Sequence, residues 1–148
     1  MNTHPYLRSF LAGIFVPTLV MPVMLAAFIV VRVVLQVPIP IERGLVFPMA
    51  LVPTIWGLWN MLWMETHLSM HQSLGLHGAV LPAVLAPAGA LTASGLGILS
   101  LGPHGVTWFQ SCQVPYALIA PLFLAALAGY YLVWKYIVGF LNRVLGIA

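Results

Sequence analysis

The chain has 148 residues, of which 62% are hydrophobic and 5% are charged, and its formal net charge is +3. A water-soluble surface normally carries about a quarter charged residues, so this composition excludes a soluble globular protein and with it a soluble enzyme. The five basic residues are scattered along the chain and form no patch that would bind nucleic acid.

Four apolar runs are long enough to cross a hydrocarbon core of about 30 Å, which takes about 20 helical residues. They cover residues 10–31, 45–64, 78–101 and 114–134. These runs lack the alternating polarity of transmembrane β-strands, so each predicts a helix. The sequence therefore predicts an all-α integral membrane protein, a four-transmembrane-helix bundle that forms a single domain over residues 1–148.

An even number of spans places both termini on one side of the membrane, together with the loop around residues 65–77. Residues 135–148 then form an interfacial tail that continues helically. Loops that flank membrane spans are richer in Lys and Arg on the cytoplasmic side, so the distribution of basic residues favours cytoplasmic termini in a bacterial-type inner membrane. The side with the termini holds Arg8, Lys135 and Arg143, and the other side holds Arg32 and Arg43.

Paired prolines recur along the chain, and each interior proline removes a backbone hydrogen bond, which predicts kinked helices. Membrane helices also tolerate proline better than soluble helices do, so the pairs have an ordinary explanation too. A duplicated helix unit around a transport cavity is a further interpretation. Pro48, Pro82 and Pro115 are expected near the starts of spans, and Pro17, Pro22, Pro53, Pro87 and Pro121 in helix interiors.

Small residues recur every four positions in the last two spans, where they would let helix backbones approach closely. We expect these two faces to pack against each other within one chain, with a face between subunits as the alternative. They are Gly78, Pro82, Ala86, Ala90 and Ser94 in one span, and Ala117, Pro121, Ala125 and Gly129 in the other.

The segment after the second span is unusually polar for this chain. No Gly or Pro lies between Pro53 and Gly75, so the second helix is predicted to continue to about Leu74 and to stop at Gly75. On such a helix the polar and amphipathic side chains share a stripe about 80° wide. The stripe consists of Trp56, Asn60, Trp63, His67 and His71.

This stripe has two interpretations. It could be one wall of a cofactor site, in which His67 and His71 bind a divalent metal or a haem and His77 or His4 completes the ligand set, or in which a quinone-like ring binds. The favoured interpretation is an interfacial belt, because Trp and His favour the headgroup layer.

Most of the chain is predicted to lie in the membrane, which leaves little surface for aqueous chemistry. We therefore expect a non-enzymatic subunit or small binding protein of a membrane assembly, in contact with lipid and with copies of itself or other membrane subunits. The alternatives are a haem- or metal-binding membrane protein that uses His67 and His71, and a small transporter or channel.

Overall fold

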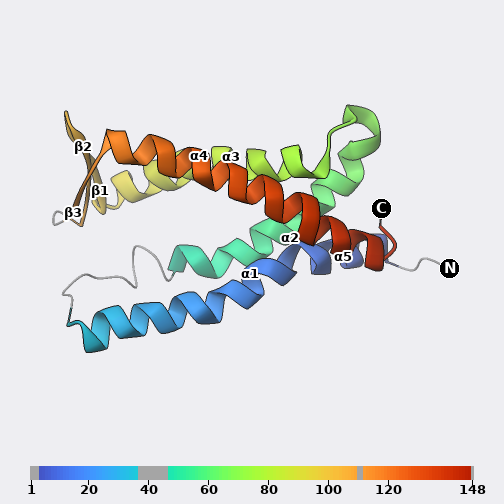
Figure 1. The fold of residues 1–148 in the computed structure, drawn as a ribbon, viewed down its shortest axis with the longest axis horizontal. Helices are drawn as coiled ribbons and strands as arrows, with labels where there is room; N and C mark the ends of the chain where they lie inside the picture. Colours follow the sequence, from blue (N-terminus) through green and yellow to red (C-terminus); the bar gives the residue numbers. More distant parts are fainter. Residues whose placement is uncertain (1–3, 37–46, 110–111, 148) are drawn as a thin grey trace.

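The computed structural model describes residues 4–36, 47–109 and 112–147, and this part of the chain is mostly helical (Figure 1). In chain order its elements are the helices and strands α1 (Pro5–Ile29), the π-helical segment η1 (Val30–Val34), α2 (Phe47–Met70), α3 (Leu74–Gly95), β1 (Leu99–Leu101), β2 (Gly105–Trp108), β3 (Cys112–Pro115), α4 (Tyr116–Leu132), the π-helical segment η3 (Val133–Val138) and α5 (Gly139–Val144).

The long helices form two layers, because α1 packs mainly on α2 and α3 packs mainly on α4. Figure 1 shows that the layers meet where α1 begins and α5 ends, and diverge toward the end that carries the sheet. Glycines allow the close contact within the first layer. A Cβ on Gly13 would stand 2.6 Å from the carbonyl oxygen of Trp56, and a Cβ on Gly57 would stand 2.5 Å from the ring of Phe10.

Three helices of the described residues are long and apolar enough to cross a membrane: Pro5–Val34, Leu74–Gly95 and Tyr116–Val144. Each contains most of one predicted span, and together they are compatible with a membrane location. α2 is not among them, although it contains most of the span predicted at 45–64. Polar residues such as Asn60 and Glu65 lower its hydropathy.

The second helix ends earlier than predicted. α2 stops at Met70, and α3 begins at Leu74 after Ser73, whose hydroxyl accepts a hydrogen bond from the Leu76 N–H at 3.3 Å. The extension to Leu74 was therefore wrong, because Ser73 acts as an N-cap that starts a new helix. Gly75, which was predicted as a stop, lies inside α3.

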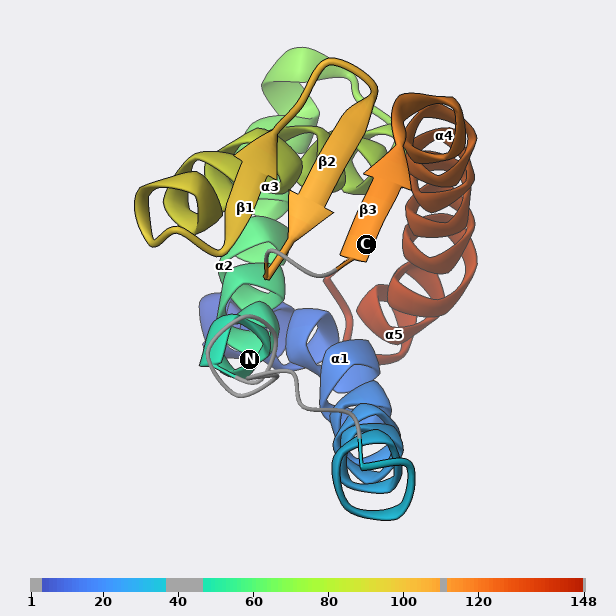
Figure 2. The same ribbon diagram turned by 90° about the vertical axis from the view of Figure 1, so that its left-hand side faces the viewer.

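A small antiparallel sheet with the order β1-β2-β3 corrects the all-α prediction. It includes Leu99–Leu101, so the third helix ends at Gly95 and not at residue 101. The chain leaves the helix through Gly97, which has a φ of 68° that favours glycine. Figure 2 shows the strands lying across one end of α3 and α4, while the last part of α1 extends away from them.

Prolines lie inside every long helix of the described chain. Five of them, Pro17, Pro22, Pro53, Pro87 and Pro121, have the interior positions predicted for them. Pro82 was expected near a helix start but lies well inside α3, because that helix begins at Leu74. Pro115 is the N-cap residue of α4, where its missing N–H costs nothing.

The buried helical residues occupy only one half of the molecule. This half, called the terminal half, contains the start of α1 and the end of α5 and comprises residues 5–17, 56–68, 74–82 and 134–147. The remaining helical residues, 18–34, 49–55, 83–95 and 116–133, form the far half, and none of them is fully buried. The two helical layers are therefore held together in the terminal half.

Candidate functional site

The stripe predicted on the second helix faces the interior of the terminal half. Trp56 and Trp63 are buried, Asn60 is completely buried and His67 is half-buried. His71 differs, because it follows the last residue of α2, is exposed and has a φ of 51°. Four of the five predicted residues therefore belong to one inward face, and the fifth does not.

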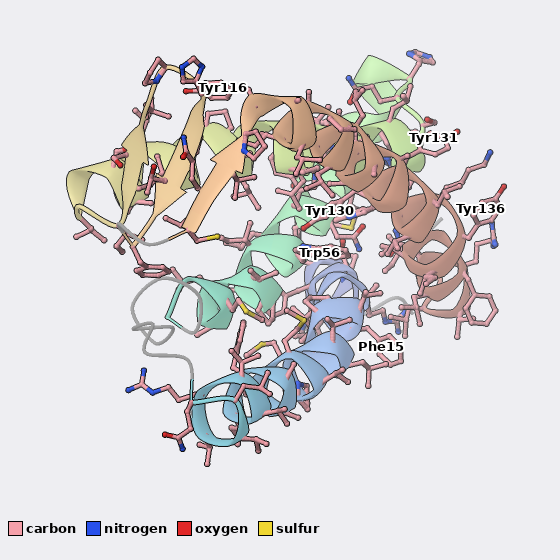
Figure 3. The ribbon with its side chains drawn as sticks, turned by 60° about the vertical axis from the view of Figure 1, so that its left-hand side comes forward. Phe15, Trp56, Tyr116, Tyr130, Tyr131 and Tyr136 are labelled. Carbon is pink, nitrogen blue, oxygen red and sulfur yellow. The ribbon has the colours of Figure 1, made fainter. Side chains whose placement is uncertain are left out.

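Trp56 packs in an aromatic cluster with two residues of the C-terminal helical run. Its ring centroid lies 5.1 Å from that of Tyr130 and 5.3 Å from that of Trp134. In Figure 3, Trp56 and Tyr130 lie close together between the two helical layers. The Trp134 ring rests directly on α3, since a Cβ on Gly78 would stand only 2.1 Å from that ring. The cluster therefore joins the two helical layers.

Trp59 and His77 connect α2 to α3 by two reciprocal hydrogen bonds. Nε1 of Trp59 donates to the His77 carbonyl oxygen at 2.9 Å, and Nε2 of His77 donates to the Trp59 carbonyl oxygen at 2.9 Å. A carbonyl oxygen can only accept, so this bond places a proton on Nε2 of His77. The two rings also stack, with centroids 4.8 Å apart. These contacts make His77 a packing residue whose Nε2 is already occupied.

Asn60 connects α2 to α1 and α5. Its Nδ2 donates to the Ser9 carbonyl oxygen at 2.8 Å and to Oδ1 of Asn142 at 2.9 Å. Nδ2 of Asn142 donates back to Oδ1 of Asn60 at 3.1 Å. Both amides are fully buried, so each satisfies polar atoms of the other that apolar surroundings could not satisfy.

His67 lies against Trp63, with ring centroids 4.6 Å apart and nearly parallel planes. Its Nδ1 is 2.9 Å from the Met64 carbonyl oxygen, which places the proton on Nδ1. In the neutral ring Nε2 then keeps the lone pair that a metal would need. His67 is therefore the histidine of the stripe with a free ligand atom in a partly enclosed position.

The other candidate ligands do not complete a metal site. Within the described ranges, no group of three or more His, Cys, Asp or Glu side chains is close enough to hold a metal ion. His77 is engaged with Trp59, His71 is exposed after α2, and His4 is exposed before α1. The set of His67, His71, His77 and His4 that the sequence suggested for a divalent metal or a haem is thus not brought together.

Several buried polar atoms of the terminal half have no hydrogen-bond partner among the residues described. An indole N–H can only donate, and leaving one buried without an acceptor costs about 1–3 kcal/mol. Water or a carbonyl oxygen would satisfy such a donor, so the interior can offer N–H groups to an acceptor. The atoms are Oγ of Ser9 and Nε1 of Trp56, Trp63 and Trp134.

Asn142 belongs to this interior but was not singled out in the sequence. Apart from Asn2, the chain has only two asparagines, Asn60 and Asn142. An amide in an apolar helix needs a partner, so that scarcity could have suggested the pair. Asn142 was instead assigned to an interfacial tail, where an amide needs no partner because water is present.

No family model, curated protein or solved structure matches the chain.

Proposed function

We propose that this chain is a small polytopic membrane protein that acts as a non-enzymatic subunit of a membrane assembly, and that it contacts its partner through the small-residue face of α4. The partner is another membrane helix, from a second copy or from a different subunit. The proposal is supported chiefly by the direction in which that face points.

α4 packs on α3 with its larger residues and not with its small ones. The half-buried positions of α4 recur every four residues, with one further position three residues after the third, so they form one face of the helix. The small residues lie two positions away from them, which is about 200° around an α-helix. The half-buried residues are Ile119, Phe123, Leu127, Tyr130 and Tyr131, and the small residues, all exposed, are Ala117, Pro121, Ala125 and Gly129.

The expected packing of the two small-residue faces on each other is therefore wrong for α4. Gly78 and Pro82 of α3 are buried, as internal packing requires, but Ala125 and Gly129 of α4 are exposed. A Cβ on Gly129 would meet no atom within 4 Å. Small residues along a membrane helix typically allow a second helix to approach closely. The direction of this face therefore favours the alternative use, contact with another subunit.

α2 is proposed as the fourth membrane-crossing helix, which would complete the four-helix bundle with both termini on one side. Its 24 residues span about 36 Å, enough for the hydrocarbon core. Its polar groups at Asn60 and Trp59 are hydrogen-bonded within the protein and are not offered to lipid. That arrangement removes the main cost of placing these residues in a membrane.

Two other functions stay open as hypotheses. A cofactor-binding protein would use His67, whose Nε2 keeps its lone pair, with a further ligand such as His71. A transporter or channel would need a path between the helical layers beside the interior prolines Pro53 and Pro87. The outward direction of the small-residue face supports the subunit proposal over both.

The size of the complex in mild detergent tests the proposal. Gly129→Leu adds a bulky side chain where the chain itself has open space, so it should release the 16.1 kDa monomer without unfolding it. Ala120→Leu is the matched control, since Ala120 is also exposed on α4 but lies about 180° around the helix from Gly129 and about 120° from the centre of the small-residue face. A wild-type protein that migrates as a monomer, or equal complex sizes for the two variants, would refute the proposal.

A further inference from the structure

Lys135 lies on the outer side of the C-terminal helical run, between two tyrosines. Its Nζ is 5.4 Å from the centroid of the Tyr131 ring and 5.3 Å from that of the Tyr136 ring, and 3.5 Å from the Tyr131 hydroxyl oxygen. Figure 3 shows Tyr131 and Tyr136 near the outer edge of the molecule, away from Trp56 and Tyr130. The ammonium group is therefore held in place by aromatic rings while it stays exposed.

The Tyr131 ring has a fixed position because it rests on the backbone of α3. A Cβ on Gly75 would stand 2.7 Å from the Tyr131 ring and 3.2 Å from Cβ of Lys135. Lys135 is thus level with the first turn of α3. That helix has 22 residues and is about 33 Å long, close to the thickness of the hydrocarbon core. If α3 crosses the membrane, Lys135 lies at the edge of the hydrocarbon core, at the depth of the lipid phosphates.

The Lys135 ammonium group and the Tyr131 hydroxyl are neighbouring hydrogen-bond donors, and no carboxylate of the described residues accepts a hydrogen bond from them. The ammonium group of Lys135 donates to the Tyr131 oxygen, which leaves its other protons and the Tyr131 hydroxyl hydrogen available. Glu65 is the only carboxylate side chain among the residues described, and it accepts a hydrogen bond from the Tyr6 hydroxyl instead. A phosphate diester is an acceptor that fits these donors in charge and in hydrogen bonding.

We propose that Lys135, Tyr131 and Tyr136 form a binding site for the headgroup phosphate of an anionic phospholipid. Lys135 supplies the charge, the Tyr131 hydroxyl supplies a second donor, and both rings hold the ammonium group by cation–π contact. Lipids with a choline group are disfavoured, because Lys135 already occupies the aromatic faces that would attract that cation. The site needs the membrane location stated under the proposed function but no protein partner.

The test uses the full chain reconstituted in phosphatidylcholine vesicles, with trace spin-labelled phosphatidylglycerol or phosphatidylcholine. One basic side chain near a bilayer surface contributes enough attraction for about a fivefold preference for the anionic lipid. We expect that preference in the wild type, its loss in Lys135→Gln, and its retention in Lys135→Arg. Tyr131→Phe, which removes only a hydroxyl, should reduce it partly. Circular dichroism of each variant checks that the helices are intact.

Arg143 provides the matched control, because it is exposed near the same end of the chain. In the part of the chain that the structure describes, no aromatic ring makes a cation–π contact with its guanidinium group. If Arg143→Gln lowers the preference as much as Lys135→Gln, the attraction is diffuse charge and the site is refuted. Displacement of the lipid by excess inorganic phosphate would also refute it, because the ligand would then come from solution. Protein that does not float with vesicles contradicts the membrane location as well, whereas protein that floats without lipid preference contradicts only this site.

Discussion

Asn60 and Asn142 are 82 positions apart in the sequence and exchange two hydrogen bonds through their side-chain amides, at 2.9 and 3.1 Å. Both side chains are completely buried. The pair fixes α5 against α2, and the further bond from Asn60 to the Ser9 carbonyl oxygen fixes α1 at the same level. This polar contact has a defined geometry in surroundings that are otherwise apolar.

Replacing one member of the pair should therefore cost more than replacing both. Asn142→Leu leaves the buried Asn60 amide without one donor and one acceptor partner, for a loss of about 1–3 kcal/mol in the free energy of unfolding. The double variant Asn60→Leu, Asn142→Leu leaves no unpaired amide and should lose less. Unfolding in mixed micelles with increasing SDS measures both. Equal stability of Asn142→Leu and wild type would mean that the amides do not meet.

Two glycines at comparable positions on membrane helices should respond in opposite ways to an added methyl group. A Cβ on Gly78 would overlap the Trp134 ring at 2.1 Å, while one on Gly129 meets nothing within 4 Å. Gly78→Ala should cost about 1–3 kcal/mol of stability through overpacking. Gly129→Ala should leave the monomer unchanged or stabilise it by up to about 1 kcal/mol, since Ala favours a helix. Unfolding in increasing SDS measures the stability of both variants. A Gly78→Ala variant as stable as the wild type would contradict the contact with Trp134.

The indole N–H groups of Trp59 and Trp63 should differ in their contribution to stability. Trp59 donates to the His77 carbonyl oxygen, whereas Nε1 of Trp63 has no acceptor among the described residues. Trp59→Phe should therefore cost about 1 kcal/mol more than Trp63→Phe, which loses only ring volume. If Trp63→Phe is the costlier change in chemical unfolding, its N–H has an acceptor such as a buried water.

The histidines provide a direct test of the cofactor hypothesis. Because no three candidate ligands of the described chain converge, we expect the purified protein to hold less than one equivalent of metal and to show no haem absorbance. The double variant His67→Ala, His71→Ala should then have an unchanged spectrum. Elemental analysis and an absorbance scan on both proteins are sufficient. A metal or a Soret band that disappears in the variant would identify His67 and His71 as ligands.

The apolar helices could be predicted from the sequence because hydrophobic length alone identifies them. Residues 10–31 lie within Pro5–Val34, and residues 114–134 correspond largely to Tyr116–Val144. The sheet could not be predicted in the same way. Leu99–Leu101 continues the apolar run of the third helix, and a short apolar strand has the same pattern as the end of a buried helix.

The stripe on α2 was predicted as a face, but its use depends on residues far away in the sequence. Asn60 pairs with Asn142, and Trp56 packs on Tyr130 and Trp134, and no local pattern indicates these partners. The prediction that His71 continues the stripe was wrong for a local reason. Ser73 caps a new helix, so His71 no longer continues the spacing of α2.

The most direct test of the subunit proposal is site-specific photo-crosslinking from α4 in cell membranes. A photoreactive residue at Ala125 lies on the small-residue face, and one at Ala120 is also exposed but lies about 120° from the centre of that face. We predict a discrete protein adduct from position 125 that disappears with Gly129→Leu, and mainly lipid adducts from position 120. Lipid adducts alone from both positions would show that this face meets the bilayer and would contradict the proposed assembly.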